Sequence, residues 1–179
     1  MGAWAGGPET SATATRSDTL KHATHSTEPA SPMETLPHRY NVAATGGPEG
    51  PVPVSADDLP TIETSTPVQF DGTGDRWSPE QLLIAAVADC FVLTFRSVAR
   101  AARLDWRHLT AQVEGLLDRD DDRRMRFLEI QIQAEVIIPG ESGRADAARC
   151  LDRAEKLCLI TNSLTAQIQL HHQITVSAD

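Results

Sequence analysis

The stretch SPEQLLIAAVADCFVLTF, residues 78–95, combines a helix start signal with a long apolar segment. Ser78 at the N-cap, Pro79 at the first helical position and Gln81 at the third form the pattern of a capping box. The residues that follow are apolar on nearly every side of a helix. We therefore expect a helix from Pro79 to about Arg103 that is covered on all sides, either by a sheet or by a second subunit.

Strand patterns lie on both sides of this helix. Between residues 40 and 70, short apolar pieces broken by glycine and proline predict two or three short strands. After the helix, Thr110 to Leu117 reads as a strand, and DRDDDRR at residues 118–124 reads as a charged hairpin connection. Apolar and polar residues then alternate from Leu128 to Ile138 with the period of a half-buried strand.

A second helix is predicted from Arg144 to about Leu159. In it Leu151, Ala154 and Cys158 share one stripe, so the Cys158 sulfur should face inward. A final alternating strand places five side chains on one face: Ile168, Leu170, His172, Ile174 and Val176. This order of elements, with no internal repeat, predicts an α+β fold.

The first 37 residues differ in composition from the rest of the chain. They are rich in Thr, Ser, Ala, Gly and Pro, contain no Val, Ile, Phe or Tyr, and show no apolar period. We expect a disordered tail over residues 1–37 and one folded domain over residues 38–179. Met33 is an alternative start of the chain, because the patterned sequence begins just after it.

Charge and composition argue against several classes of function. The net charge of −9 and the pI near 5.1 disfavour binding to nucleic acid. The longest apolar run, Leu82 to Ala88, is short of the ~20 residues that span a bilayer, and no secretory signal is visible. We expect a cytoplasmic protein without a membrane segment. Scattered histidines and the lack of a glycine-rich loop between a strand and a helix argue against a metal or nucleotide cofactor.

Three cysteines without zinc-type spacing favour reduced thiols. A cysteine in an apolar helix, as at Cys90, is usually a packing residue, and burial alone makes a thiol inert. A reactive Cys90 therefore needs a cationic or hydrogen-bonding neighbour. Cys150 lies roughly 80° round the predicted helix from Cys158 and more than about 10 Å away, so we interpret it as structural.

Glu80 lies in the first helical turn, where the helix dipole favours a carboxylate. Ten residues separate it from Cys90, which corresponds to about 15 Å along the helix axis. The two side chains cannot touch within one helix, and any link between them has to pass through a third residue.

Two segments of the chain resemble the OsmC/Ohr family of hydroperoxide reductases. WSPEQLL at residues 77–83, leading to Asp89-Cys90-Phe91, is similar to the family helix P-E-Q/E-L…A-x-C-F. AEKLCLITNSL at residues 154–164 resembles the second signature, A-x-x-x-C-P-Y/I/V-S. The resemblance covers Tyr40 to Val176.

The resemblance implies an OsmC-like fold, with antiparallel sheets around a long buried central helix in an intertwined homodimer. It also implies a peroxidase without metal or organic cofactor. The residue matching the first family cysteine, Cys90, would attack an organic or inorganic hydroperoxide and become a sulfenic acid. Cys158 would then form a disulfide with it, and a dithiol donor, lipoyl-linked in several members, would restore both thiols. Glu80 would hold an arginine against the reactive sulfur.

Two positions depart from the family pattern. The arginine that Glu80 should hold falls at Pro48 or at Gln69 in the two branches of the family, and neither position carries arginine here. Arg39 and Arg76 are nearby, but neither matches the motif. Leu159 replaces the proline after the second cysteine. These departures leave an alternative function open, that of a non-catalytic OsmC-like protein that binds a small ligand or senses redox state.

Overall fold

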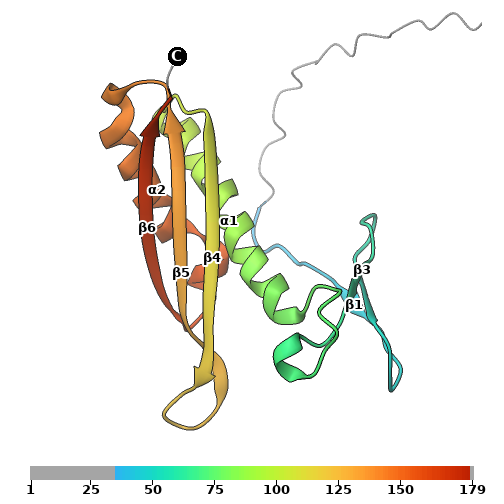
Figure 1. Ribbon diagram of the computed structural model, residues 1–179. Coiled ribbons are helices and arrows are strands. Elements are labelled where there is room, and N and C mark those ends of the chain that lie inside the picture. The colour runs from blue at the N-terminus through green and yellow to red at the C-terminus, as the bar shows by residue number, and fades with distance from the viewer. Residues whose placement is uncertain (1–34, 178–179) are drawn as a thin grey trace, which may run out of the picture. The chain divides into compact units, whose positions relative to one another are not determined.

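The computed structural model describes residues 35–177. Contacts divide the chain into two units, Met1–Tyr40 and Asn41–Asp179. Of the first unit, the described residues 35–40 include no helix or strand. The predicted disordered tail lies outside the described residues as far as residue 34. Figure 1 shows the elements of the second unit.

Three short strands open the second unit. They are β1 (Ala43–Ala44), β2 (Val52–Ser55) and β3 (Ile62–Thr64), which pair antiparallel in this order. A short 3₁₀ helix, η1 (Val68–Phe70), follows. The prediction of two or three short strands between residues 40 and 70 is confirmed.

Helix α1 (Pro79–Ala102) begins with the predicted capping box. The Gln81 N–H donates to the Ser78 hydroxyl at 3.2 Å, and the Gln81 side-chain oxygen accepts from the Ser78 N–H at 3.0 Å. The helix ends at Arg103, which adopts a left-handed conformation and donates its N–H to the carbonyls of Ala99 and Arg100.

The second sheet contains β4 (His108–Arg119), β5 (Met125–Ile138) and β6 (Gln167–Val176), in the order β4-β5-β6. Strands β4 and β5 form the predicted hairpin. Strand β6 runs parallel to β5, so the expectation of antiparallel sheets is wrong for this pair. The reason is the helical crossover between β5 and β6, which returns the chain to the end where β5 began.

The crossover contains η2 (Glu141–Gly143), α2 (Arg144–Leu157) and the short helix α3 (Leu159–Asn162). The predicted helix to Leu159 is therefore interrupted at Cys158, whose backbone is extended with φ −65° and ψ 114°. The Cys158 carbonyl accepts the Thr161 hydroxyl and the Asn162 N–H, both at 3.1 Å, and so begins a new helix.

Helices α1 and α2 pack on one face of the β4-β5-β6 sheet (Figure 1). Strand β5 supplies every second residue to this core, as its alternation predicts, and the fully buried ones are Ile130, Ile132, Val136 and Ile138. Gly115 in β4 permits the close approach of α1, because a Cβ there would lie 2.5 Å from the Ile84 Cδ1 atom. The α+β class is confirmed.

The opposite face of α1 is left uncovered by the described part of the chain. Val87, Phe91 and Phe95 are fully buried, whereas Leu93 is 48% exposed. By length and composition alone α1 could cross a membrane, since its mean hydropathy reaches 1.9, but core helices of soluble proteins share this property. The predicted all-round burial of α1 is therefore not achieved by residues 35–177 alone.

Candidate thiol site

Cys90 lies at the middle of α1, at the edge of the buried stripe, and is half-buried. Thr94, one helical turn further on, places its hydroxyl oxygen 3.9 Å from the Cys90 sulfur. Residues four apart in a helix lie on the same face, which explains this contact. The α1 helix thus presents a thiol with a hydroxyl beside it.

Cys158 reaches the same place from the junction of α2 and α3, and it is fully buried. Helix α3 packs against α1, and the Cys158 thiol is close enough to the Cys90 thiol for each to shift the pKa of the other. Both cysteines are free thiols. The structure therefore brings together two sulfurs that are far apart in the chain, as the family resemblance implies.

The two thiols have pKa values shifted in opposite directions. Burial raises the pKa of Cys90, but the polar groups of Ile160, Cys158, Thr94 and Leu159 lower it, and the net shift is downward. Burial also raises the pKa of Cys158, and the donation to Cys90 adds to this increase. These shifts favour the thiolate form at Cys90 and the neutral thiol at Cys158.

Cys150 lies apart from this pair. It is buried in α2 as a free thiol, and burial followed by the charge of Asp146 raises its pKa. A buried thiol with a raised pKa is unreactive, in agreement with its interpretation as a structural residue.

The largest causes of the Cys90 pKa shift are burial and uncharged polar groups, and no arginine, lysine or histidine is among them. Arg76 is engaged elsewhere, because it pairs with Asp75 and, at 3.2 Å, with Glu63. Gln69, at one of the two family arginine positions, lies in η1. The one side-chain contact of the Cys90 sulfur that the described chain shows, with the Thr94 hydroxyl, is to a neutral group.

Glu80 is not brought to Cys90 within one chain. It lines a groove of about 950 Å³ formed by η1, the start of α1 and the β4-β5 hairpin, and Cys90 does not line that groove. One carboxylate oxygen of Glu80, Oε2, is buried and has no hydrogen-bond partner in the part of the chain that the structure describes. A buried carboxylate oxygen without a partner is costly, so this geometry calls for a donor from outside the described residues.

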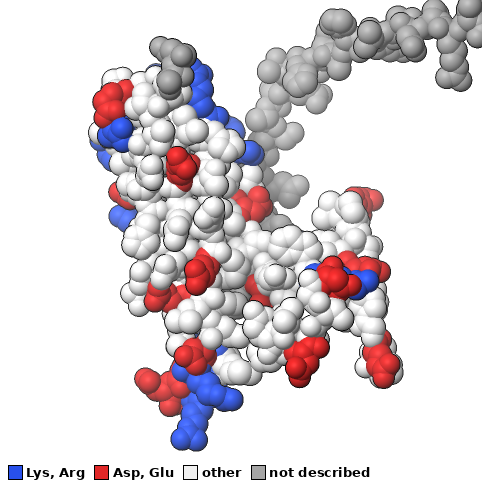
Figure 2. Space-filling model, viewed as in Figure 1, with Lys and Arg blue, Asp and Glu red and all other residues white. Residues whose placement is uncertain are grey.

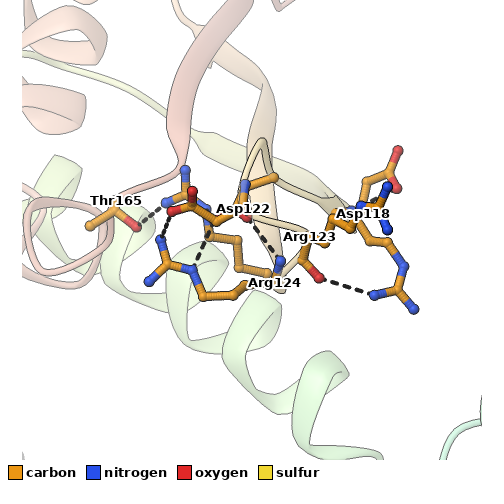
Figure 3. Close-up of polar contacts among 8 residues, drawn as sticks. Asp118, Asp122, Arg123, Arg124 and Thr165 are labelled. Atoms are coloured by element: carbon orange, nitrogen blue, oxygen red, sulfur yellow. Dashed lines mark hydrogen bonds and ion pairs between the residues drawn. The ribbon is translucent and has the colours of Figure 1, made fainter.

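The β4-β5 hairpin is tied to the connection that follows α3 (Figure 3). Arg126 donates to the Thr165 hydroxyl at 2.9 Å and pairs with Asp120 at 3.2 Å. Asp120 also accepts the N–H groups of Asp122 and Arg124. Figure 2 shows basic and acidic side chains together at this hairpin tip, the lowest part of the view. These contacts anchor the far end of the segment that carries Cys158.

No group of three or more metal-ligating side chains occurs in residues 35–177.

Residues 72–173 match the family model of OsmC-like proteins. The chain belongs to the OsmC-like protein family. An organic hydroperoxide resistance protein from Xanthomonas axonopodis pv. citri is 28% identical over 146 residues, covering 79% of this chain and 96% of that protein. YmaD, an uncharacterized protein from Bacillus subtilis, is 22% identical over 134 residues, covering 69% and 89%.

Solved structures of OsmC-like proteins share the fold. An OsmC-like protein from Vibrio cholerae superposes with a TM-score of 0.70 at 16% identity, covering 76% of this chain and 99% of that one. An organic hydroperoxide resistance protein from Elizabethkingia anophelis superposes with a TM-score of 0.65 at 21% identity, covering 81% and 100%. Hydroperoxide resistance is thus a function found among the relatives of this OsmC-like chain.

Sequence reasoning missed several groups around the thiols of this OsmC-like protein. The spacing of four between Cys90 and Thr94 was a usable signal. The approach of the start of α3 to Cys90 carried no such signal, because only the packing of α3 against α1 produces it.

Proposed function

We propose that this OsmC-like protein is a thiol peroxidase that reduces organic hydroperoxides. The Cys90 thiolate attacks the outer oxygen of the hydroperoxide, the O–O bond breaks, and Cys90 becomes a sulfenic acid. The alkoxide that leaves takes up a proton and departs as an alcohol. The peroxide is thereby reduced by two electrons and the sulfur is oxidised by two.

In the second step the Cys158 sulfur attacks the Cys90 sulfenic acid. A disulfide forms between Cys90 and Cys158, and the hydroxyl of the sulfenic acid leaves as water after taking up a proton. An external dithiol then reduces this disulfide by exchange and is itself oxidised to a disulfide. No metal or organic cofactor takes part in either step.

The observation that carries this proposal is the paired arrangement of the thiols. Cys90 and Cys158 are adjacent and both free, and their pKa values are shifted in opposite directions. A peroxide-attacking sulfur has to be a thiolate, whereas its resolving partner has to remain protected until the sulfenic acid forms. Full burial of Cys158 supplies that protection.

We further propose that the working form is a homodimer in which Glu80 of each chain contributes to the partner's thiol site. Support comes from the uncovered apolar face of α1 and from the buried, unpartnered Oε2 atom of Glu80. A second chain packed on α1 would cover the exposed Leu93 and would bring polar groups to Glu80. Glu80 would then act at the Cys90 of the partner chain, so its distance from Cys90 in its own chain would not matter.

The test is to treat reduced protein with cumene hydroperoxide and to count free thiols. We expect wild type to lose two thiols and Cys158→Ser to stop at a sulfenic acid that dimedone traps. Cys90→Ser should lose activity by about 10³-fold or more, the scale expected for a missing nucleophile. Cys150→Ser serves as the control and should behave like wild type. Wild-type protein that keeps both Cys90 and Cys158 reduced would rule out the peroxidase.

A second candidate function is binding of a small apolar ligand without catalysis. The groove of about 950 Å³ favours it, because its wall combines apolar side chains such as Phe70 and Phe127 with the unpartnered carboxylate of Glu80. Retained binding of apolar probes in the Cys90→Ser variant, together with no thiol loss in wild type, would select this function over the peroxidase.

A further inference from the structure

Residues 158–165, the Cys158 segment, lead from the end of α2 to the start of β6. Hydrogen bonds run along this segment. The Cys158 carbonyl accepts the Thr161 hydroxyl and the Asn162 N–H, both at 3.1 Å, and the Thr161 carbonyl accepts the Leu164 N–H at 3.0 Å. The segment is therefore held together as one piece, and a contact at its far end affects the position of Cys158.

The far end of the Cys158 segment is held by Arg126 of β5 (Figure 3). The Arg126 Nη1 atom donates to the Thr165 hydroxyl at 2.9 Å, while its Nε pairs with the Asp120 Oδ2 atom at 3.2 Å. A guanidinium has five N–H donors in a fixed fork, so it can serve two acceptors at once. Backbone pairing of β6 with β5 starts only at Gln167. Among residues 35–177, the Arg126 bond is thus the hydrogen bond to the sheet that lies nearest to Cys158 along the chain.

Asp120 fixes the direction of the Arg126 side chain. The Asp120 side chain is only 10% exposed, and its Oδ1 atom accepts the N–H groups of Asp122 and Arg124 at 3.0 and 2.9 Å. A carboxylate that accepts two backbone hydrogen bonds has little freedom to rotate, and its charge strengthens the bond to the guanidinium. The hairpin tip is therefore a fixed support from which Arg126 reaches Thr165.

We propose that Arg126 is a positioning residue for the thiol pair, which acts through Thr165 to keep Cys158 beside Cys90. The inference rests on the proposed function in one respect, namely that these two thiols form a disulfide. Closing that bond requires the two sulfurs to meet, and an ordered segment raises the effective concentration of one thiol at the other. Because Arg126 is exposed, its loss should lower that concentration without unfolding the protein.

The test measures the equilibrium between the dithiol and the Cys90–Cys158 disulfide in glutathione buffers. Glutathione disulfide takes two electrons and two protons from the thiol pair and leaves as two thiols. Acid quenching followed by peptide mapping gives the oxidised fraction. We expect Arg126→Gln to lower the equilibrium constant for disulfide formation about fivefold, the effect of one hydrogen bond of ordinary strength.

Arg124→Gln is the matched control. Arg124 also pairs with Asp120, at 3.5 Å, but makes no hydrogen bond to Thr165 in the described chain, so this variant should match wild type. Thr165→Val removes the acceptor instead of the donor and should show the same loss as Arg126→Gln, whereas Thr165→Ser keeps the hydroxyl and should match wild type. The double variant of Arg126→Gln and Thr165→Val should lose no more than either single variant, because both changes break one bond.

Thermal unfolding shows whether each variant folds, and Thr165→Val decides the matter if Arg126→Gln does not. Equilibrium constants that equal the wild-type value in the folded variants would overturn the inference, even if the protein reduces peroxides. Additive losses in the double variant would also overturn it, because each residue would then act on its own. The expected loss in a protein that reduces no peroxide would instead contradict the proposed function alone.

Discussion

At the scale of single residues, the environment of each cysteine differs although all three lie in or next to a helix. Cys90 is half-buried beside the Thr94 hydroxyl with its pKa lowered, whereas Cys158 and Cys150 are buried with their pKa values raised. Nucleophilicity toward a peroxide or an alkylating agent requires the thiolate. The three thiols should therefore differ strongly in reactivity.

We expect Cys90 to be alkylated first as the pH is raised toward 9. Because its pKa is lowered, Cys90 has a larger thiolate fraction than an ordinary thiol at the same pH. The raised pKa values of Cys158 and Cys150 give these two residues smaller thiolate fractions. Timed labelling with iodoacetamide followed by peptide mapping measures the order. In urea the three cysteines should label at similar rates, and preferential labelling of Cys158 or Cys150 in the folded protein would refute the assignment.

At the scale of the elements, the start of α1 sets the position of the groove and of Glu80. Ser78 is fully buried, and its hydroxyl satisfies the N–H of Gln81 at the first turn. Pro79 then directs the chain into the helix. This local signal is complete within four residues, and for that reason it was readable from the sequence.

Ser78→Ala should lower the free energy of unfolding by about 1–2 kcal/mol, because it leaves the Gln81 N–H without its acceptor at a buried helix end. Chemical denaturation measures the change. Ser97→Ala is the matched control, since Ser97 is an exposed position inside the same helix and should change stability by less than about 0.5 kcal/mol. Equal effects of the two substitutions would contradict the role of the cap.

At the scale of the whole molecule, one chain leaves the apolar helix α1 half covered. Its core face packs against α2 and the sheet, and Leu93 lies on the face that nothing in the described chain covers. Burial of such a face in a second subunit gains about 25 cal/mol for each Å² of apolar surface. The proposed dimer follows from this unsatisfied face together with the unpartnered carboxylate of Glu80.

Leu93→Asp should weaken the proposed dimer by on the order of 100-fold or more, because it places an unpaired charge at the apolar interface. Analytical ultracentrifugation should show wild type at twice the chain mass of 19.4 kDa and the variant near the mass of one chain. Leu157→Asp is the control, since Leu157 has the same 48% exposure but lies on α2. A wild-type protein that sediments as a monomer would refute the dimer.

The sequence by itself determined the α+β class, the capped helix from Pro79, the alternating strand β5 and the inward direction of Cys158. Each of these depends on neighbours within one or two turns of helix or a few strand residues, and such short-range preferences are written into the local pattern. The end of α2 was predicted two residues too late, because the break at Cys158 depends on hydrogen bonds to its carbonyl.

Only the tertiary structure decided the parallel pairing of β6, the meeting of the two sulfurs and the neutral donors around Cys90. A crossover connection can place the next strand on either side of the strand before it. The distance between the Cys90 and Cys158 sulfurs depends on how their helices pack, and no local sequence pattern encodes that packing. The start of α3 comes close to Cys90 because α3 packs against α1, and this packing depends on contacts between elements far apart in the sequence.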